Sequence, residues 1–164
     1  MKQDMAIEKN CHRGRWNYQL RIVKRPKIFN VLVMQDNPKA TLDLWISRVN
    51  ELAVEDLLDL YSENAVLLPT FSDALLTGKD GIRSYFEELG GHQSIEVSVV
   101  EDSLITQSFS DNLQAISGIY QWRFGGGGDE VVTVEARFTF FLDLSLTSPI
   151  LHHHSSQLPR KPTG

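Results

Sequence analysis

The stretch Val131-Val-Thr-Val-Glu-Ala-Arg-Phe-Thr-Phe-Phe-Leu142 decides the fold class, because its β-branched and aromatic residues predict a long β-strand. Two further strands are predicted before it, at the run Leu113 to Phe124 and at the alternating segment Ile95 to Val100. The tract Gly125 to Gly128 joins the two long strands as a hairpin loop. It is not a phosphate cradle, since no Lys-Ser/Thr pair follows it. The second half of the chain is therefore predicted to be an antiparallel sheet.

The residues before this sheet show helical spacing. An amphipathic helix is predicted after Asn37-Pro38, and a second short helix around Leu57 to Tyr61. Thr77, followed three places later by Asp80, predicts the start of another helix. The short apolar run Ala65 to Thr70, broken by a proline, suits an edge strand. Helices followed by antiparallel strands predict an α+β fold, in which a curved, mostly antiparallel sheet packs on N-terminal helices. The apolar positions of the first helix are Leu42, Trp45, Ile46, Val49, Leu52 and Ala53.

Charge divides the chain into unequal parts. The chain has 164 residues and a net charge of -5. Residues 1–33 contain eight Lys or Arg against two acids, a balance of +6, so the remainder carries -11 with eight basic and nineteen acidic residues. We interpret residues 1–36 as a basic, disordered extension, residues 37–160 as the domain and residues 161–164 as a tail. The acidic domain argues against nucleic acid as a partner.

Composition excludes several other classes of protein. No apolar stretch approaches the roughly 18 residues that cross a bilayer, so we expect no membrane partner. Cys11 is the only cysteine, which excludes a disulfide framework and a thiolate metal cluster. Charges interrupt every apolar run in residues 1–30, so no secretory signal is expected there. A cytoplasmic location is the resulting prediction. A transit peptide, or an upstream extension that ends before Met34, are alternative interpretations of the basic residues.

A cluster of three histidines near the C-terminus is the best clue to chemistry. In Ile150-Leu-His-His-His-Ser-Ser-Gln-Leu-Pro159, strict strand alternation would place Ile150, His152, His154 and Ser156 on one face. Imidazole exchanges protons near neutral pH, and a neighbouring hydroxyl can orient water or a small polar substrate. Three other interpretations stay open. The histidines could be solvated at a strand end, belong to a purification-tag remnant, or bind zinc through His152 and His154, although catalytic zinc needs a third protein ligand.

Four motifs stand out along the chain. They are Leu67-Leu-Pro-Thr70, Ile82-Arg-Ser-Tyr-Phe86, Ala136-Arg-Phe-Thr-Phe140 and His152-His-His-Ser-Ser-Gln-Leu-Pro159. With these motifs and this order of elements, the chain resembles the nuclear transport factor 2-like superfamily over about residues 37–160. Within it the chain is similar to the branch related to the association domain of calcium/calmodulin-dependent protein kinase II. Its histidine-serine-proline ending resembles the motif of the iota-class carbonic anhydrases, some of which work without metal, with Leu158 in place of a methionine.

This resemblance implies a reversible hydration of carbon dioxide to bicarbonate that needs no cofactor. It places the catalytic residues His154, Ser156, Thr70 and Tyr85 in one pocket, with His154 as general base and the hydroxyls as hydrogen-bond partners. His152 and Arg137 are implied to help bind the substrate.

Two other classes of function compete with this one. Relatives in the kinase-association branch assemble through the sheet, which implies a homodimer or higher homo-oligomer, or a non-catalytic association or ligand-binding module. Phe138, Phe140 and Phe141 are candidates for such an interface, and core packing is the alternative interpretation for some of them. An isomerase or cyclase is the third class, but the sequence shows no obvious carboxylate base for it.

Overall fold

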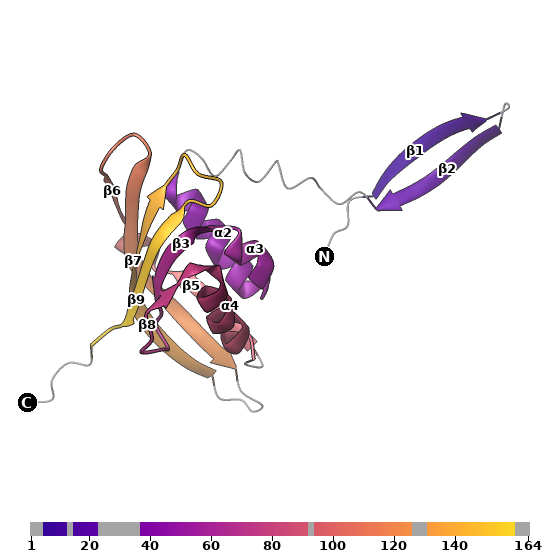
Figure 1. Ribbon diagram of the computed structural model, residues 1–164. Coiled ribbons are helices and arrows are strands. Elements are labelled where there is room, and N and C mark those ends of the chain that lie inside the picture. The colour runs from indigo at the N-terminus through magenta and orange to yellow at the C-terminus, as the bar shows by residue number, and fades with distance from the viewer. Residues whose placement is uncertain (1–4, 13–14, 23–36, 92–93, 126–130, 160–164) are drawn as a thin grey trace, which may run out of the picture. The chain divides into compact units, whose positions relative to one another are not determined.

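A computed structural model of the chain describes residues 5–12, 15–22, 37–91, 94–125 and 131–159 (Figure 1). The chain divides into two compact units, Met1–Leu32 and Val33–Gly164. In the first unit, strand β1 (Met5–His12) pairs antiparallel with strand β2 (Arg15–Ile22). This hairpin lies within the predicted basic extension, whose role stays a prediction. The predicted tail at 161–164 lies outside the described residues.

The second unit begins with the helices that the sequence predicts. Helix α2 (Pro38–Asn50) has proline at its first position, and the Asn37 side chain accepts a hydrogen bond from the backbone N–H of Lys39 at 2.8 Å. The short helix α3 (Val54–Leu58) follows, and Tyr61 already belongs to a strand. Helix α4 (Gly78–Leu89) begins after Thr77 as predicted, but the Thr77 hydroxyl makes no capping hydrogen bond. All three helices lie on one side of the curved sheet (Figure 1).

The sheet has seven strands in the order β4-β3-β9-β8-β7-β5, with β6 paired to β7. Strand β9 lies between β3 and β8, in the interior of the sheet, and its pairing with β3 is parallel while the other pairings are antiparallel. The α+β prediction is confirmed in this mixed, open form. The elements after α3 are β3 (Tyr61–Leu68), β4 (Leu76–Thr77), β5 (Ser94–Val99), the 3-10 turn η1 (Glu101–Ser103), β6 (Ile105–Ser108), β7 (Leu113–Gly125), β8 (Val131–Asp143) and β9 (Ile150–Gln157).

The prediction of an edge strand around Ala65 to Thr70 is wrong. Strand β3 has neighbours on both sides, because β4 pairs with it at Val66 and Leu67 while β9 pairs with its other edge. Pro69 follows the last residue of β3, so it removes no hydrogen bond from the ladder. The proline marks the end of this strand and not its place in the sheet.

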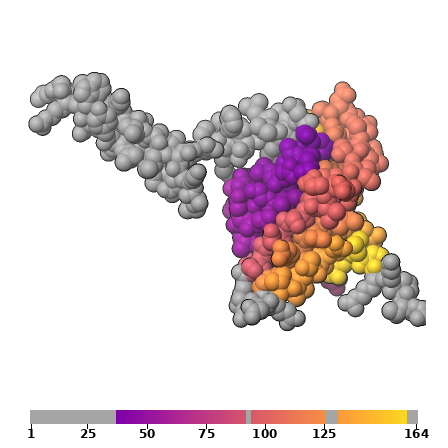
Figure 2. Space-filling model, turned by 180° about the vertical axis from the view of Figure 1, so that it is seen from behind, coloured from indigo at the N-terminus to yellow at the C-terminus, as the bar shows by residue number. Residues whose placement is uncertain are grey.

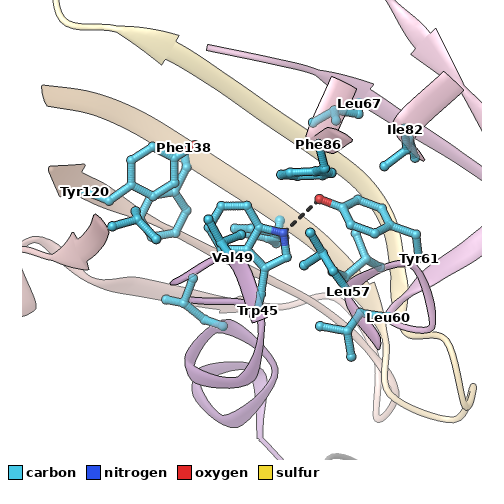
Figure 3. Close-up of a cluster of buried hydrophobic side chains, with 14 of the residues drawn as sticks. Trp45, Val49, Leu57, Leu60, Tyr61, Leu67, Ile82, Phe86, Tyr120 and Phe138 are labelled. Atoms are coloured by element: carbon cyan, nitrogen blue, oxygen red, sulfur yellow. Dashed lines mark hydrogen bonds between the residues drawn. The ribbon is translucent and has the colours of Figure 1, made fainter. Parts of the chain in front are cut away.

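Trp45 of α2 lies at the centre of the buried core. Its side chain is fully buried, with Tyr120 stacked 6.0 Å away on one side and Tyr61 on the other (Figure 3). Phe138 stacks on Tyr120 at 4.7 Å. Phe138 and Phe140 are both buried here, so the prediction that they form an external interface is wrong, because alternation along β8 turns both toward the helices.

Helix α2 is fixed to the sheet at its C-terminal end. The Asn50 amide donates to the carbonyl oxygen of Val97 at 3.0 Å and accepts from its backbone N–H at 2.7 Å. Strand β5 is the last strand in the sheet order, and these two bonds satisfy the backbone N–H and C=O groups of Val97 on it. Helix α2 and strand β5 lie side by side, although other helices and strands separate them in the sequence (Figure 2). None of the helices in the described part of the chain is long and apolar enough to span a membrane.

Candidate functional site

A β-bulge decides which residues of β9 face the interior. Leu142 of β8 pairs with Ile150, but the next residue, Phe141, pairs with His152, so Leu151 is an extra residue in β9. A bulge of this kind shifts side-chain alternation by one place. Ile150 and His153 are consequently both buried, at 0% and 2% exposed. Simple alternation placed His152, His154 and Ser156 on the same face as Ile150, and this prediction is wrong.

His153 occupies the interior with its ring held on several sides. Its Nδ1 atom lies 2.8 Å from the Tyr61 hydroxyl, which in turn accepts a hydrogen bond from Trp45 Nε1 at 2.9 Å. Phe140 stacks on the imidazole with ring centroids 3.9 Å apart, and Trp45 meets it edge-on at 5.2 Å. The Nε2 atom of His153 is buried and has no hydrogen-bond partner among the described residues.

Burial determines the charge of this histidine. Removal from water disfavours the imidazolium form, and the pKa of His153 is therefore well below its ordinary value. The neighbouring His152 and His154 lower it further. His153 is thus neutral at physiological pH, and its Nε2 atom is a buried polar group that no described residue satisfies.

A group of hydroxyls lies two residues further along the same face. Ser155 is buried and hydrogen-bonds to the hydroxyls of Thr70 and Tyr120. Burial raises the pKa of Tyr120 to about 12, against the opposing effect of its hydrogen bonds to Ser155 and Thr70. The phenol therefore stays protonated. We call His153, Ser155, Thr70, Tyr120 and Tyr61 the interior cluster.

Tyr85 lies beside this cluster on helix α4. Its ring packs edge-on against Phe86 at 5.1 Å and is only partly buried. Burial raises the pKa of the Tyr85 phenol, and the nearby Tyr120 raises it further. The hydroxyl of Tyr85 is therefore neutral and can only act as a hydrogen-bond donor or acceptor. A direct bond to Ser155 or Thr70 is not among its contacts in the described structure.

The remaining predicted site residues lie together on the opposite face of the sheet, which we call the outer face. His154 is exposed and pairs across the strands with Thr139. Ser156 accepts a hydrogen bond from Arg137 Nε at 3.0 Å. The half-exposed His152 has a lowered pKa through burial and the neighbouring His154. The predicted set is thus divided: His154, Ser156, His152 and Arg137 are outside, while Thr70 and Tyr85 are inside.

Sequence reasoning missed four members of the interior arrangement. Tyr120 could have been found from alternation within Leu113 to Phe124, because Ile116, Tyr120 and Trp122 share the buried face. No comparable signal marks His153 and Ser155, since their orientation depends on the bulge at Leu151. Tyr61 was hidden by its assignment to a helix. In the described part of the chain, no group of three His, Cys, Asp or Glu residues lies close enough together to hold a metal ion.

Comparison with solved structures identifies the fold. A protein named as a calcium/calmodulin-dependent protein kinase II association domain from Xanthomonas campestris superimposes with a TM-score of 0.67 at 24% identity, covering 74% of this chain and 86% of that one. A nuclear transport factor 2-like protein of unknown function from Pseudomonas putida gives a TM-score of 0.63 at 16% identity, covering 76% and 87%. The chain has the nuclear transport factor 2-like fold.

The same fold carries other names among similar structures. A protein named as a scytalone dehydratase from Novosphingobium aromaticivorans has a TM-score of 0.66 at 9% identity and covers 80% of this chain and 89% of its own. No protein-family model and no curated protein matches the chain. These neighbours show the nuclear transport factor 2-like fold, and their names do not support the narrower resemblance to iota-class carbonic anhydrases. Function must therefore be argued from the site, because one fold supports many activities.

Proposed function

We propose that the chain hydrates carbon dioxide to bicarbonate without a metal, and that the interior cluster performs the reaction. The observation that carries this proposal is the buried Nε2 atom of His153, which has no hydrogen-bond partner among the described residues. The buried Ser155 lies on the same face of β9. A buried polar atom without a hydrogen bond is costly, and such atoms are often completed by a ligand or water. Carbon dioxide and water together supply the hydrogen-bonding groups that this atom lacks.

The corrected register keeps the motif at the centre of the proposal. The shift turns one histidine and one serine inward, His153 and Ser155, instead of His154 and Ser156. Thr70, which ends the Leu67 to Thr70 motif, hydrogen-bonds directly to Ser155. Two of the four motifs behind the resemblance therefore meet in the interior of the fold. This agreement supports a shared role for them, while the identity of the substrate rests on the resemblance.

The reaction balances with hydroxyl groups alone. The oxygen of a water molecule attacks the carbon of carbon dioxide, so one C–O bond forms as one C=O bond becomes single. Ser155 takes the proton that the water loses and gives its own proton to the carbon dioxide oxygen. The product is carbonic acid, which ionises to bicarbonate and a proton in solvent. His153 contacts the reacting molecules through Nε2, and burial strengthens each of these hydrogen bonds.

The experiment is carbon dioxide hydration by the full chain, followed by stopped flow with and without a chelator. Ser155→Ala and His153→Gln should each lower the rate by about 10²–10³, the usual loss when one preorganised hydrogen-bonding group is removed. The rate should be unchanged by the chelator.

Matched variants on the outer face serve as controls. His154→Ala and Ser156→Ala change the same residue types in the same strand, and both should keep the wild-type rate because these side chains face away from the cluster. Activity that depends on His154 and not on His153 would contradict the proposal. No hydration by any form would reject the activity altogether.

Self-association is the second candidate function, and exposed apolar residues favour it. Phe109 is 60% exposed and packs at 5.3 Å on Phe141, which belongs to the outer face of β8. Ile105 on the adjacent strand β6 is 63% exposed. Contiguous apolar side chains on a sheet face are typical of protein interfaces. In this function the chain acts as a homodimer or higher homo-oligomer, with or without catalysis.

A further inference from the structure

We propose that Tyr61 is a positioning residue, which with Trp45 fixes the tautomer of His153 so that the proton lies on Nε2. The site then presents a hydrogen-bond donor, and its ligand must offer an acceptor oxygen. This inference deepens the proposed function and rests on it for placing a ligand beside His153. The position of the proton itself is a property of the protein without ligand.

The indole nitrogen of Trp45 can only donate a hydrogen bond. Trp45 Nε1 lies 2.9 Å from the Tyr61 hydroxyl, so the oxygen of Tyr61 accepts this bond. The dashed line in Figure 3 marks this contact between the two buried rings. Tyr61 is 0% exposed, and its own hydroxyl proton must therefore find an acceptor inside the protein.

His153 supplies that acceptor. Its Nδ1 atom lies 2.8 Å from the Tyr61 oxygen, within hydrogen-bond distance. A neutral imidazole has one nitrogen that donates and one that accepts. If Tyr61 donates to Nδ1, the ring proton must lie on Nε2. The two bonds then run in one direction, from Trp45 to Tyr61 and from Tyr61 to His153.

The other tautomer leaves more groups unsatisfied. With the proton on Nδ1, His153 would donate to the Tyr61 oxygen, which already accepts from Trp45. The hydroxyl proton of Tyr61 would then have no acceptor in the described structure, and Nε2 would still lack a partner. With the proton on Nε2, the Nε2–H group is the one member of this chain of three residues left without a partner among the described residues. Fewer buried unsatisfied groups favour this tautomer.

Packing keeps the ring from exchanging its two nitrogens. Phe140 stacks on one face at 3.9 Å with an interplanar angle of 18°, and Trp45 meets the ring at 87°. Close packing of this kind holds a side chain in one rotamer. Nε2 therefore stays directed away from Tyr61, as a fixed donor rather than an acceptor.

A fixed donor selects the class of ligand. Hydroxyls such as Ser155 and Thr70 can donate or accept, so they adapt to either kind of partner. His153 Nε2–H cannot adapt, and it favours molecules with a carboxylate, bicarbonate or carbonyl oxygen. It disfavours ammonium and other groups that can only donate. In the proposed hydration, His153 thus stabilises a carbon dioxide oxygen and does not remove the proton of water.

The decisive measurement is a long-range nitrogen–proton correlation spectrum of the full chain labelled with nitrogen-15 at neutral pH. We expect the Nε2 signal of His153 at the position of a protonated ring nitrogen and Nδ1 at that of an unprotonated one. A protonated Nδ1, or averaged signals, would overturn the inference. This result requires neither a ligand nor catalytic activity.

Tyr61→Phe tests the positioning role. The variant keeps the ring and loses only the hydroxyl, so Nδ1 is no longer required to accept. The Nε2 signal of His153 should then move toward the unprotonated position as the second tautomer becomes populated. Signals of the exposed His154 should not move and serve as the internal control. An unmoved Nε2 signal in the folded variant would contradict the role of Tyr61. If the variant does not fold, the wild-type spectrum still decides the tautomer.

Three salts test the ligand class. Sodium formate and sodium bicarbonate offer acceptor oxygens, and each should shift the Nε2 proton of His153 downfield in the wild-type chain. Ammonium chloride at equal ionic strength should not. A response to ammonium alone, or to none of the three salts, would overturn the assigned ligand class. Absence of carbon dioxide hydration with a formate response would reject the proposed reaction and leave this inference standing.

Discussion

The two faces of strand β9 carry the same residue types in opposite environments. His153 and Ser155 are 2% and 4% exposed, while His154 is exposed and Ser156 is half-buried beside Arg137. One extra residue at Leu151 decides which histidine and which serine enter the core. Residue types and their spacing can thus indicate a site, while a single bulge determines which of the residues face it.

The environments differ in what they ask of a side chain. On the inner face, His153 makes one hydrogen bond and two close ring contacts. Its Nε2 atom is buried and has no hydrogen-bond partner among the described residues. On the outer face, His154 is exposed to solvent. Substitutions at these adjacent positions should therefore have very different consequences for stability and activity.

The largest expected difference is in folding stability. His153→Ala removes a buried ring and leaves the Tyr61 hydroxyl without its acceptor, which should lower the free energy of unfolding by about 2–5 kcal/mol. His154→Ala should change it by less than about 0.5 kcal/mol. Urea unfolding of both variants measures the two values. Equal losses would show that the inner and outer assignment is wrong.

The next difference concerns pH. The folded-state pKa of His153 is depressed, mainly by burial, so the unfolded state takes up a proton first as the pH falls below about 6.5. Above that pH, the contribution of His153 to the free energy of unfolding should be constant. As the pH falls further, this contribution should decrease by up to about 1.4 kcal/mol per pH unit.

Paired variants isolate this contribution. His153→Gln should remove that part of the acid destabilisation, whereas His154→Gln should retain it, because His153 remains buried in the second variant. Denaturant unfolding between neutral and mildly acidic pH provides the slopes. Identical slopes in wild type and His153→Gln would show that another group accounts for the acid sensitivity.

A smaller difference is expected between hydroxyl pairs on the two faces. Tyr120→Phe deletes the inner bond to Ser155 and should cost about 1 kcal/mol of stability. Ser117→Ala deletes the bond to Thr139, which is 2.8 Å long and lies on the outer face, and should cost less than about 0.5 kcal/mol. Thermal unfolding of the two variants under one condition compares them. A larger loss from Ser117→Ala would reverse the ranking of the faces.

The smallest effect on the folded chain itself should come from the exposed apolar group. Phe109→Ser removes a side chain that is 60% exposed, so the fold should stay intact while self-association weakens. Sedimentation at micromolar concentration should show a dimer or larger species for wild type and a shift toward monomer for the variant. A wild-type monomer of 18.6 kDa would contradict self-association.

Local periodicity was enough to predict the main elements. The spacing of Leu42, Trp45 and Val49 indicated the buried face of α2, and all three residues are buried. Strands β7 and β8 were found from β-branched and aromatic residues, because packing on a sheet favours these types. The order of helices and strands then predicted the α+β fold.

The site could be predicted only in part, because its geometry depends on contacts distant in sequence. The sequence predicted Thr70 beside Ser156, whereas the hydroxyl of Thr70 hydrogen-bonds to Ser155. The partner of His153 is Tyr61, 92 positions earlier in the chain. Neither the bulge nor this long-range pairing leaves a local pattern in the sequence, so simple alternation chose the wrong face.

The central position of β9 also has a consequence for biosynthesis. The sheet order places this late strand between β3 and β8, so the early β3 has no parallel neighbour until residues 150–157 have been made. In a growing chain on the ribosome, the strand between β3 and β8 would still be missing, and Tyr61 and Leu67 would be exposed. Such open edges recruit other chains. Productive folding should thus wait until β9 has emerged from the ribosome, and chaperones that shield nascent chains should raise the yield.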